Sequence, residues 1–340
     1  MAGKRVTLAD VARLAGLSPT SASMILNGRP NTRLSQEAHD RVFEAAKKLG
    51  YRPNVAARGL RTEKTSTIGF ISDVVATTRF ASGLIKGALE AAEAARHVML
   101  VLETGGEPAR EAEAVGAVLD RQVDGIIFAS MRAREFYVPE IPSGTGVVML
   151  NATNSMYPTC VLPDEYAGGR LAVETLVAHG HRSIALIGYS AEVERDVFRS
   201  ETVARRVQGI QDAMREHGLE FAAEESIWLW EPDKGYHVTR SLMSKRRGDI
   251  GALLCMNDRI AFGAYQALAE LGLRVPEDVS IMSFDNDEIA SYLRPGLTTI
   301  ALPHEAMGRR AVELLLAGAG RGPTLVEMPL VERASIATVG

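Results

Sequence analysis

Two short helical patterns of apolar residues lie close together near the start of the chain. Each has its own start signal: Thr7 can cap the first helix, with Asp10 reaching back to a free amide, and Ser18 followed by Pro19 begins the second. Helical spacing places on one buried side Leu8, Val11, Ala12 and Ala15 of the first helix and Ala22, Ile25 and Leu26 of the second. The pattern predicts two packed helices joined by a tight turn.

The second of these helices presents small polar residues and one methionine on its outer side, namely Thr20, Ser21, Ser23 and Met24. Two helices joined by a short turn are typical of a helix-turn-helix, whose second helix lies in the major groove of DNA. An ordinary helical hairpin within a bundle is the alternative, because small polar residues are also common on exposed helix faces.

A third helix and a short basic segment follow. Residues 35–50 predict a helix with an acidic residue in its first turn, two lysines in its last turn and a glycine at its end. Asn54 can cap a further segment that ends near Leu60. With only about two turns and an internal glycine, this segment is marginal as a helix in water. We therefore expect it to become helical on DNA.

Charge is divided unevenly along the chain. Residues 1–64 contain 12 Lys and Arg against 5 Asp and Glu, a net of +7, and residues 65–340 contain 26 against 37, a net of −11, which together give −4. Local positive charge neutralises DNA phosphates and makes the affinity fall steeply with salt. A basic module attached to an acidic body favours a DNA-binding function over a merely solvated charged surface.

Composition places the rest of the chain among globular proteins. At 340 residues, 46% of them hydrophobic, it has room for a small domain and either one larger domain or two lobes. No apolar run approaches the length of a membrane span, and the start lacks the features of a secretory signal. Cys160 and Cys255 lie in apolar surroundings, as structural thiols do. We expect a cytoplasmic protein with no membrane partner.

From Thr65 onward, short apolar runs alternate with amphipathic helices. Runs typical of buried strands span 68–72, 98–102, 125–129, 147–150, 183–188, 252–255, 279–284 and 325–328. Helical patterns span 82–96, 110–121, 165–179, 202–217, 259–271 and 305–316. This alternation predicts an α/β body with doubly wound parallel sheets. Because the series restarts after Pro163, we expect two similar lobes with a cleft between them.

Polar residues follow several of the predicted strands. In open α/β sheets, ligands bind outside the carboxyl ends of the strands. We expect ligand contacts from the residues that follow predicted strands, namely Asp73, Asn151, Asn257 and Asp285. Arg206 is added because it lies in an Arg-x-x-Gly helical pattern, and Trp230 because it lies in a loop. Carboxylates, amides and one arginine around an apolar cleft suit a polyhydroxylated ligand such as a sugar or a sugar derivative.

The alternative for each of these residues is a local structural role. Asp and Asn commonly cap the helix that follows a strand. For Asp258 and Asn286, such a capping role is as well supported by the sequence as ligand binding. The spacing of His179 and His181 is a weak signal for a pair of metal ligands. Structural roles at the end of a helix and the start of a strand are favoured for these two histidines.

An enzyme is the rival class of protein, either one that converts a sugar or one that depends on a nucleotide, with an accessory helical domain. The chain contains no G-x-G-x-x-G after a predicted strand, no phosphate-binding G-x-x-x-x-G-K-[ST] loop, no G-x-S-x-G and no H-E-x-x-H. We therefore expect no catalytic residues, no cofactor and no metal.

The first 61 residues resemble the DNA-binding headpiece of the LacI/GalR family of bacterial transcription regulators. The resemblance rests on TLADVARLAGLS at 7–18, Leu26-Asn27-Gly28 at the end of the second helix and LGYRPN at 49–54. The body resembles the type I periplasmic-binding-protein fold, which the same family carries as its effector domain, through GHRSIALIG at 180–188 and VPEDVS at 275–280.

The resemblance implies a repressor that is a homodimer, whose two headpieces read the two halves of a double-stranded DNA operator. It implies that the effector contacts fall on the strand-end residues named above. DNA contacts are expected at Thr7, Ser18, Pro19, Thr20, Ser21, Met24, Asn27, Asn54, Arg58 and Leu60. Of these, Thr20, Ser21 and Met24 are expected to read bases. Leu60 is expected to wedge into the minor groove.

Two positions depart from the family pattern. Met24 stands where many members carry an arginine that pairs with guanine, so the operator should differ there. Leu302 stands where members often place a glutamine that reaches the effector, which argues against carrying over any particular sugar. The expected division is a headpiece with a hinge helix over 1–61, a linker over 62–66 and an effector-binding and dimerisation domain over 67–340.

Overall fold

The computed structural model describes residues 6–27, 34–51, 64–79, 81–189, 200, 202–318 and 320–339. The chain divides into two compact units, residues 1–65 and 66–340, which are described separately below. The predicted hinge helix, with Asn54, Arg58 and Leu60, lies outside the described residues.

The described residues of the first unit form three helices, α1 (Leu8–Ala15), α2 (Pro19–Leu26) and α3 (Gln36–Leu49). The predicted start signals are confirmed, because Thr7 and Asp10 form a reciprocal capping box and Ser18 caps α2 with Pro19 as its first residue. The three helices enclose a small core of Val11, Ala12, Ala15, Ala22, Ile25, Ala38, Val42, Ala45 and Ala46. This unit therefore has a core of its own.

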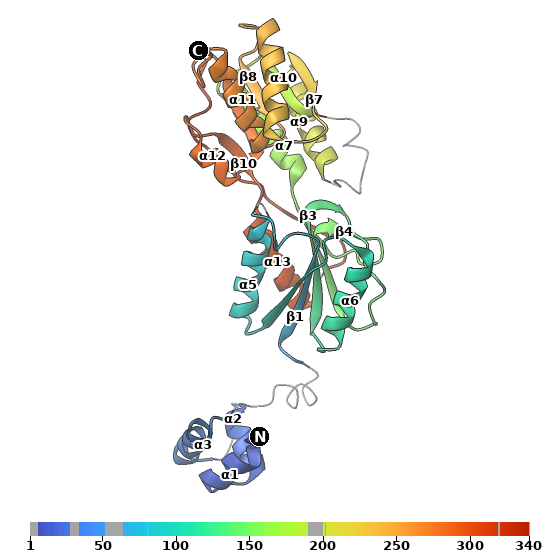
Figure 1. Ribbon diagram of the computed structural model, residues 1–340, viewed down its shortest axis with the longest axis vertical. Helices are drawn as coiled ribbons and strands as arrows, with labels where there is room; N and C mark the ends of the chain where they lie inside the picture. The colour runs from blue at the N-terminus through green and yellow to red at the C-terminus, as the bar shows by residue number, and fades with distance from the viewer. Residues whose placement is uncertain are drawn as a thin grey trace. The chain divides into compact units, whose positions relative to one another are not determined.

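The second unit consists of two lobes, each built on a six-stranded sheet (Figure 1). The first sheet has the order β11-β5-β4-β3-β1-β2, with all neighbours parallel. Its strands are β1 (Thr67–Ser72), β2 (Val98–Glu103), β3 (Gly125–Glu135), β4 (Gly146–Thr153), β5 (Cys160–Pro163) and β11 (Pro323–Val326). Helices α5 (Ser82–Ala94) and α13 (His304–Ala317) cover one face, and α6 (Pro108–Leu119) covers the other.

The second sheet has the corresponding order β12-β10-β9-β8-β6-β7. Its strands are β6 (Ile184–Tyr189), β7 (Ala223–Ser226), β8 (Ala252–Cys255), β9 (Ser280–Asp285), β10 (Thr298–Ala301) and β12 (Leu330–Val331), of which only β12 is antiparallel to its neighbour. The helices among its described residues are α7 (Glu165–Ala178), α9 (Val203–Glu216), α10 (Pro232–Lys245), α11 (Asp258–Glu270) and α12 (Glu288–Tyr292). The predicted pair of parallel α/β lobes is confirmed.

The chain crosses between the lobes more than once, which corrects one expectation. The series does restart in the second lobe after Pro163, but the helix predicted at 305–316 returns to the first lobe as α13 and packs on α5. Strand β11 then joins the edge of the first sheet beside β5 before the chain enters the second lobe again at β12. The first lobe is therefore assembled from two separate stretches of sequence.

Pairs of glycines let neighbouring helices approach closely. A Cβ atom on Gly169 of α7 would lie 2.3 Å from the carbonyl oxygen of Arg206 in α9, and one on Gly209 of α9 would lie 2.1 Å from that of Tyr166. Equivalent pairs join α5 to α13 and α10 to α11, namely Gly87 with Gly308 and Gly235 with Gly263. Since real side chains cannot approach a backbone so closely, these crossings require glycine on both helices.

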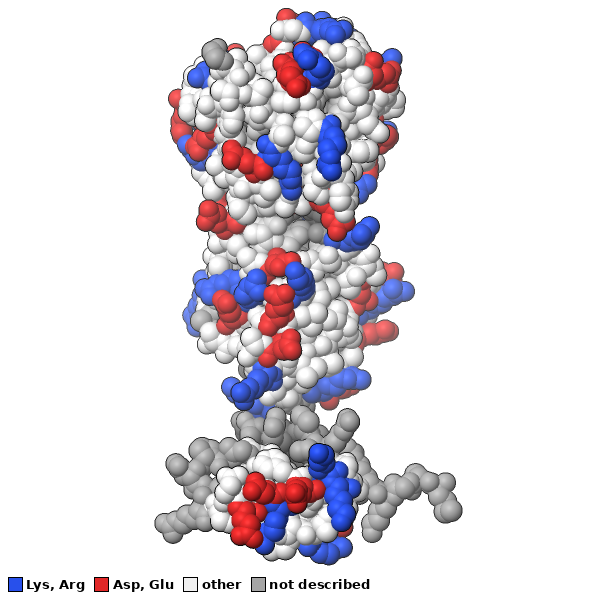
Figure 2. Space-filling model, turned by 90° about the vertical axis from the view of Figure 1, so that its left-hand side faces the viewer, with Lys and Arg blue, Asp and Glu red and all other residues white. Residues whose placement is uncertain are grey.

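Charge on the body is mixed. Over the face of residues 66–340 drawn in Figure 2, Lys and Arg alternate with Asp and Glu, and no large area of one sign is visible. The acidic excess of the body is thus dispersed on this face, as expected for a surface that is solvated.

Candidate functional site

The outer side of α2 carries the residues that were predicted to read bases. Thr20 is exposed and Met24 half-buried, whereas Ala22 and Ile25 on the opposite side are buried. The hydroxyl of Ser21, which is half-buried, lies 2.9 Å from that of Ser18 at the N-cap. Thr20 is therefore exposed on the outer side of α2, whereas the Ser21 hydroxyl lies against the N-cap.

The starts of α1 and α2 are both accessible. The exposed residues Thr7, Ser18 and Pro19 lie at these two N-termini. The N-terminus of a helix attracts anions such as phosphate, because its first amides are unpaired and its dipole is positive there. At the other end of α2, Asn27 donates from its side-chain amide to the Ser23 carbonyl oxygen at 2.7 Å, which holds it at the helix end.

A cavity of about 300 Å³ lies between the two lobes of the body. It brings together five of the six predicted effector residues, namely Asn151, Arg206, Trp230, Asn257 and Asp285. The other lining residues are Thr78, Met131, Arg132, Ala133, Pro163, Glu165, Ser200, Thr202, Val203, Trp228, Leu229, Glu231, Arg259 and Leu302. The lining combines apolar and aromatic walls with a few polar groups, as ligand pockets commonly do.

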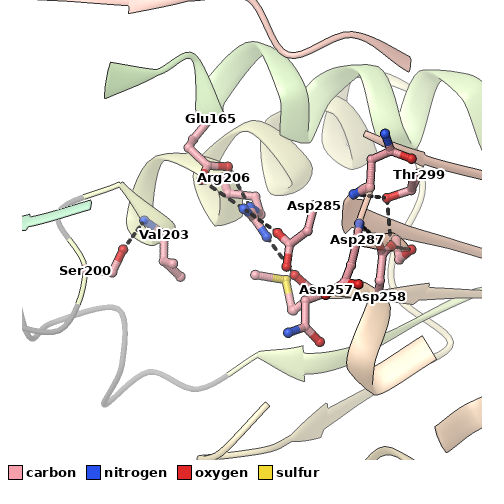
Figure 3. A network of polar contacts seen from close by, with 12 residues as sticks. Glu165, Ser200, Val203, Arg206, Asn257, Asp258, Asp285, Asp287 and Thr299 are labelled. Carbon is pink, nitrogen blue, oxygen red and sulfur yellow. Dashed lines mark hydrogen bonds and ion pairs between the residues drawn. The ribbon is translucent and has the colours of Figure 1, made fainter. Parts of the chain in front are cut away.

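Arg206 is the centre of the polar contacts in the second lobe (Figure 3). Its Nε donates to Glu165 Oε2 at 2.6 Å and its Nη2 to Glu165 Oε1 at 2.9 Å, a bidentate pair in which both side chains are nearly fully buried. Its Nη1 donates to the Met256 carbonyl oxygen at 2.6 Å. The glycine contact between α7 and α9 explains this geometry, because Gly169 lies one turn after Glu165 and faces the backbone of Arg206.

Two aromatic rings fix the plane of this guanidinium. The Cζ of Arg206 lies 4.4 Å from the ring centroid of Phe284 and 5.9 Å from that of Trp230. Trp230 is anchored in turn, since its Nε1 donates to the Gly188 carbonyl oxygen at 2.9 Å. Arginine stacked on aromatic rings loses little orientational freedom, so this wall is rigid before any ligand arrives.

Asp285 and Asn151 occupy corresponding strands of the two sheets, β9 and β4, and both have left-handed backbone conformations, with φ of 106° and 50°. Such strain at non-glycine residues concentrates at ligand sites. Burial raises the pKa of Asp285 well above its ordinary value, opposed by Arg206, whose Nη2 lies 3.8 Å from Asp285 Oδ1. The charge of nearby Asp258 raises the pKa further.

Asn257 and Asp258 have different roles although they are neighbours. Asn257 lines the cavity while its Oδ1 accepts from the Ile260 amide at 2.8 Å, which caps α11. Asp258 is fully buried and accepts from the hydroxyls of Ser283 at 2.5 Å and Thr299 at 2.8 Å. For Asp258, therefore, the structural alternative is the one that the geometry supports.

Asp73 does not line the cavity, contrary to the prediction. Its carboxylate accepts from the Ser130 hydroxyl at 2.7 Å, from the amides of Val74 and Met131 at 2.6 and 2.9 Å, and from Arg134 Nη2 at 3.2 Å. These four donors belong to the loops and strands of the first lobe itself. Asp73 ties the end of β1 to β3 and leaves Asn151 as the predicted first-lobe residue in the cavity.

Glu165 is the main residue that sequence reasoning missed. It is the second residue after β5, so the rule of strand carboxyl ends would have nominated it if β5 had been recognised. That strand has only four residues and includes Pro163, which hid the pattern. Trp228 and Leu229 were missed as well, because irregular backbone carries no periodic signal.

In the described part of the chain, no cluster of three or more His, Cys, Asp or Glu residues is placed to hold a metal ion. The same residues include no helix that is long and apolar enough to cross a membrane. Cys160 and Cys255 are both buried, and burial raises the pKa of the Cys255 thiol.

Comparison with known proteins agrees with this organisation. The model of the bacterial regulatory proteins of the lacI family matches residues 7–54, and that of a periplasmic binding protein-like domain matches residues 173–336. The chain is 31% identical over 339 residues to the sucrose operon repressor of Escherichia coli, covering 97% of this chain and 99% of the relative. It is 30% identical over 316 residues to the ribose operon repressor of Haemophilus influenzae, covering 91% of each.

Among solved structures, the lac repressor dimer bound to operator and the anti-inducer ONPF matches with a TM-score of 0.75 and 26% identity, over 98% of this chain and 100% of that one. The fold and these matches define a DNA-binding transcription repressor with a small-molecule effector domain, rather than an enzyme. The chain belongs to the lacI family of bacterial regulatory proteins.

Proposed function

We propose that this protein is a homodimeric repressor whose affinity for a near-palindromic operator is set by a small, polyhydroxylated effector bound between the lobes of the body. The observation that carries the proposal is the cavity, in which Arg206 of α9 and four residues from strand ends and a loop converge from both lobes. A ligand that binds one lobe arrangement more tightly than another changes the DNA equilibrium by that difference in affinity.

In this proposal the headpiece reads the operator through the outer side of α2. Thr20, Ser21 and Met24 contact bases, while Thr7, Ser18, Pro19, Asn27, Asn54 and Arg58 position the sugar-phosphate backbone. Leu60 from each subunit enters the minor groove at the operator centre. Their support is the exposure of α2 and its N-terminus, and the basic charge of residues 1–64.

A sugar or a sugar derivative is the effector class that the lining favours. Arg206, Asn257 and Asp285 supply donors and acceptors that pair hydroxyl groups, and Trp230 supplies an aromatic face. Relatives named for the ribose and sucrose operons are consistent with this class. The protein would then act in the cytoplasm, where its operator lies.

The first experiment identifies the operator and tests the role of α2. Selection from random duplexes yields the preferred site, and fluorescence anisotropy then measures its affinity against salt and against a panel of sugars. Met24→Arg should change the base preference at one position in each half-site, because arginine pairs with guanine as methionine cannot. A selection that returns the same site for Met24→Arg and the wild type would show that Met24 does not face the bases.

The second experiment identifies the effector. A thermal-shift screen of sugars and related metabolites finds ligands that bind the native state, since these raise its melting temperature. A ligand that raises the melting temperature should also change operator affinity in the anisotropy assay. If every stabilising ligand leaves operator binding unchanged, the body is not an effector domain for the headpiece.

A further inference from the structure

Glu165 occupies much of the donor capacity of Arg206. A guanidinium has five N–H groups, and three of those on Arg206 donate to Glu165 Oε1, Glu165 Oε2 and the Met256 carbonyl oxygen. Two N–H groups remain, one each on Nη1 and Nη2, and Asp285 Oδ1 lies 3.8 Å from Nη2. Glu165 therefore occupies the Nε/Nη2 edge of Arg206, and a ligand can accept only from the N–H groups that remain on Nη1 and Nη2.

The same contact cancels the positive charge of this wall. The side chains of Arg206 and Glu165 are only 3% and 4% exposed, so solvent screens them little and the two charges neutralise each other locally. The next arginine along the second-lobe wall, Arg259, is likewise paired with a lining carboxylate, that of Glu231. In the second lobe, the lining arginines therefore offer no uncompensated positive charge to an incoming anion.

We propose that Glu165 determines the charge of the effector, so that the site beside Arg206 accepts the hydroxyl groups of an uncharged ligand and excludes carboxylate, sulfate or phosphate groups. This inference rests on the proposed effector role of the cavity and specifies its ligand class. An anion placed beside Arg206 would lie next to the carboxylates of Glu165 and Asp285, and both lining arginines of the second lobe are already paired; Arg132 lines the cavity from the first lobe. A hydroxyl accepts from the remaining N–H groups of Arg206 and donates to Asp285.

Inorganic sulfate is a suitable probe, because it keeps its charge across the working pH range and needs no knowledge of the natural effector. The two tryptophans of the chain, Trp228 and Trp230, both line the cavity, so intrinsic fluorescence reports binding at this place. The full-length protein is titrated with sulfate, and sodium chloride at equal ionic strength is the reference. Melting temperatures are measured in the same solutions.

The wild type should show no saturable, sulfate-specific change in fluorescence. Glu165→Gln removes the negative charge but keeps the size of the side chain, so sulfate should bind it at least about tenfold more tightly than the wild type and restore part of its lowered melting temperature. Glu165→Asp keeps the charge and should exclude sulfate like the wild type. In the double variant Glu165→Gln/Arg206→Met, the gain in sulfate affinity should be abolished. Glu165→Ser, which leaves room beside Arg206, replaces Glu165→Gln if the latter does not fold.

Three outcomes overturn the proposal: saturable sulfate binding to the wild type, folded Glu165→Gln and Glu165→Ser variants that gain no sulfate binding, or a gain that survives Arg206→Met. A purely structural Glu165 would lower the melting temperature without creating an anion site. Failure here leaves the effector role of the cavity untouched, because that role is judged by the response of operator binding to ligands found in the thermal-shift screen.

Discussion

The two lobes of the body share a strand order but treat their arginine–carboxylate pairs differently. In the second lobe, Arg206 and Glu165 meet at 2.6 Å with side chains 3% and 4% exposed, and both line the cavity. In the first lobe, Arg134 and Asp73 meet at 3.2 Å with side chains 27% and 8% exposed, and neither lines it. Equivalent architecture thus places a buried arginine–carboxylate pair in the cavity wall of one lobe and keeps the corresponding pair of the other lobe away from the cavity.

The corresponding positions Asn151 and Asp285 show the same contrast. Asn151 donates from its amide to the carbonyl oxygens of Ser130 and Met131 at 3.0 and 3.2 Å, so the first lobe holds it through its own backbone. Asp285 instead lies beside Arg206 in a network of charges. A ligand should therefore bind the second lobe first, and the first lobe should close on it through Asn151 and the apolar Met131.

The largest effect is expected from Arg206→Ala. It leaves the Glu165 carboxylate buried without its partner, which should lower the free energy of unfolding by about 3–5 kcal/mol and abolish the effector response. Arg134→Ala in the first lobe should cost no more than about 1 kcal/mol, because that pair is partly solvated. Chemical denaturation and operator titrations measure both effects. Equal losses for the two variants would remove the contrast between the lobes.

Gly209→Ala should have the next largest effect. The new Cβ would press on the Tyr166 carbonyl oxygen of α7, and a net loss of about 2 kcal/mol is expected from overpacking offset by helix propensity. Gly308→Ala, at the matching crossing of α13 and α5, should cost about as much. Only Gly209→Ala should also weaken effector binding, since it shifts α7 and with it Glu165. Calorimetric titration of the effector found by thermal shift distinguishes the two variants.

Asp285→Asn tests the charge of the second-lobe wall. Because burial raises the pKa of Asp285, the folded protein binds this proton more tightly than the unfolded chain does. Stability from this group is lost as pH rises from the ordinary aspartate pKa of 3.8 toward the raised value, so the variant should gain melting temperature relative to the wild type over that range. Effector affinity should fall about tenfold. A relative melting temperature that falls with rising pH would contradict the assignment.

The smallest effect is expected from Asp73→Asn. Since its carboxylate is held by groups of the first lobe, the variant should lose about 1 kcal/mol of stability and change effector affinity by less than about twofold. Asn151→Ala, which removes a cavity residue from the same lobe, is the matched variant and should weaken the effector more. A large loss of affinity in Asp73→Asn would restore the role that the sequence predicted for it.

The sequence predicts the headpiece helices closely because their signals are local. Thr7 with Asp10, and Ser18 with Pro19, mark helix starts by chemistry that acts within one turn. The alternation of apolar runs and helices likewise predicts most of the parallel strands. Helix α10 (Pro232–Lys245) was missed because its sequence is mostly polar, and β7 because AEES is a short edge strand with little apolar content.

The side-chain arrangement of the site could be predicted only in part. Rules about strand ends correctly bring Asn151, Asn257 and Asp285 to one cavity. They cannot distinguish a side chain that faces the cavity from one held by its own lobe, which is why Asp73 was placed wrongly. They also cannot predict the pair of Glu165 and Arg206. These residues are 41 positions apart in the sequence, and their contact depends on how closely α7 and α9 pack.

The return of α13 and β11 to the first lobe has a consequence for biosynthesis. A ribosome makes β1 early, but the lobe that contains it stays incomplete until residue 326 has emerged, because α13 supplies part of its core and β11 its sheet edge. Most of the second lobe is synthesised in between. Long-range closure of this kind slows folding and exposes apolar surface on the nascent chain. Chaperone demand during translation should therefore be greatest at the unfinished face of β1, β3 and β4.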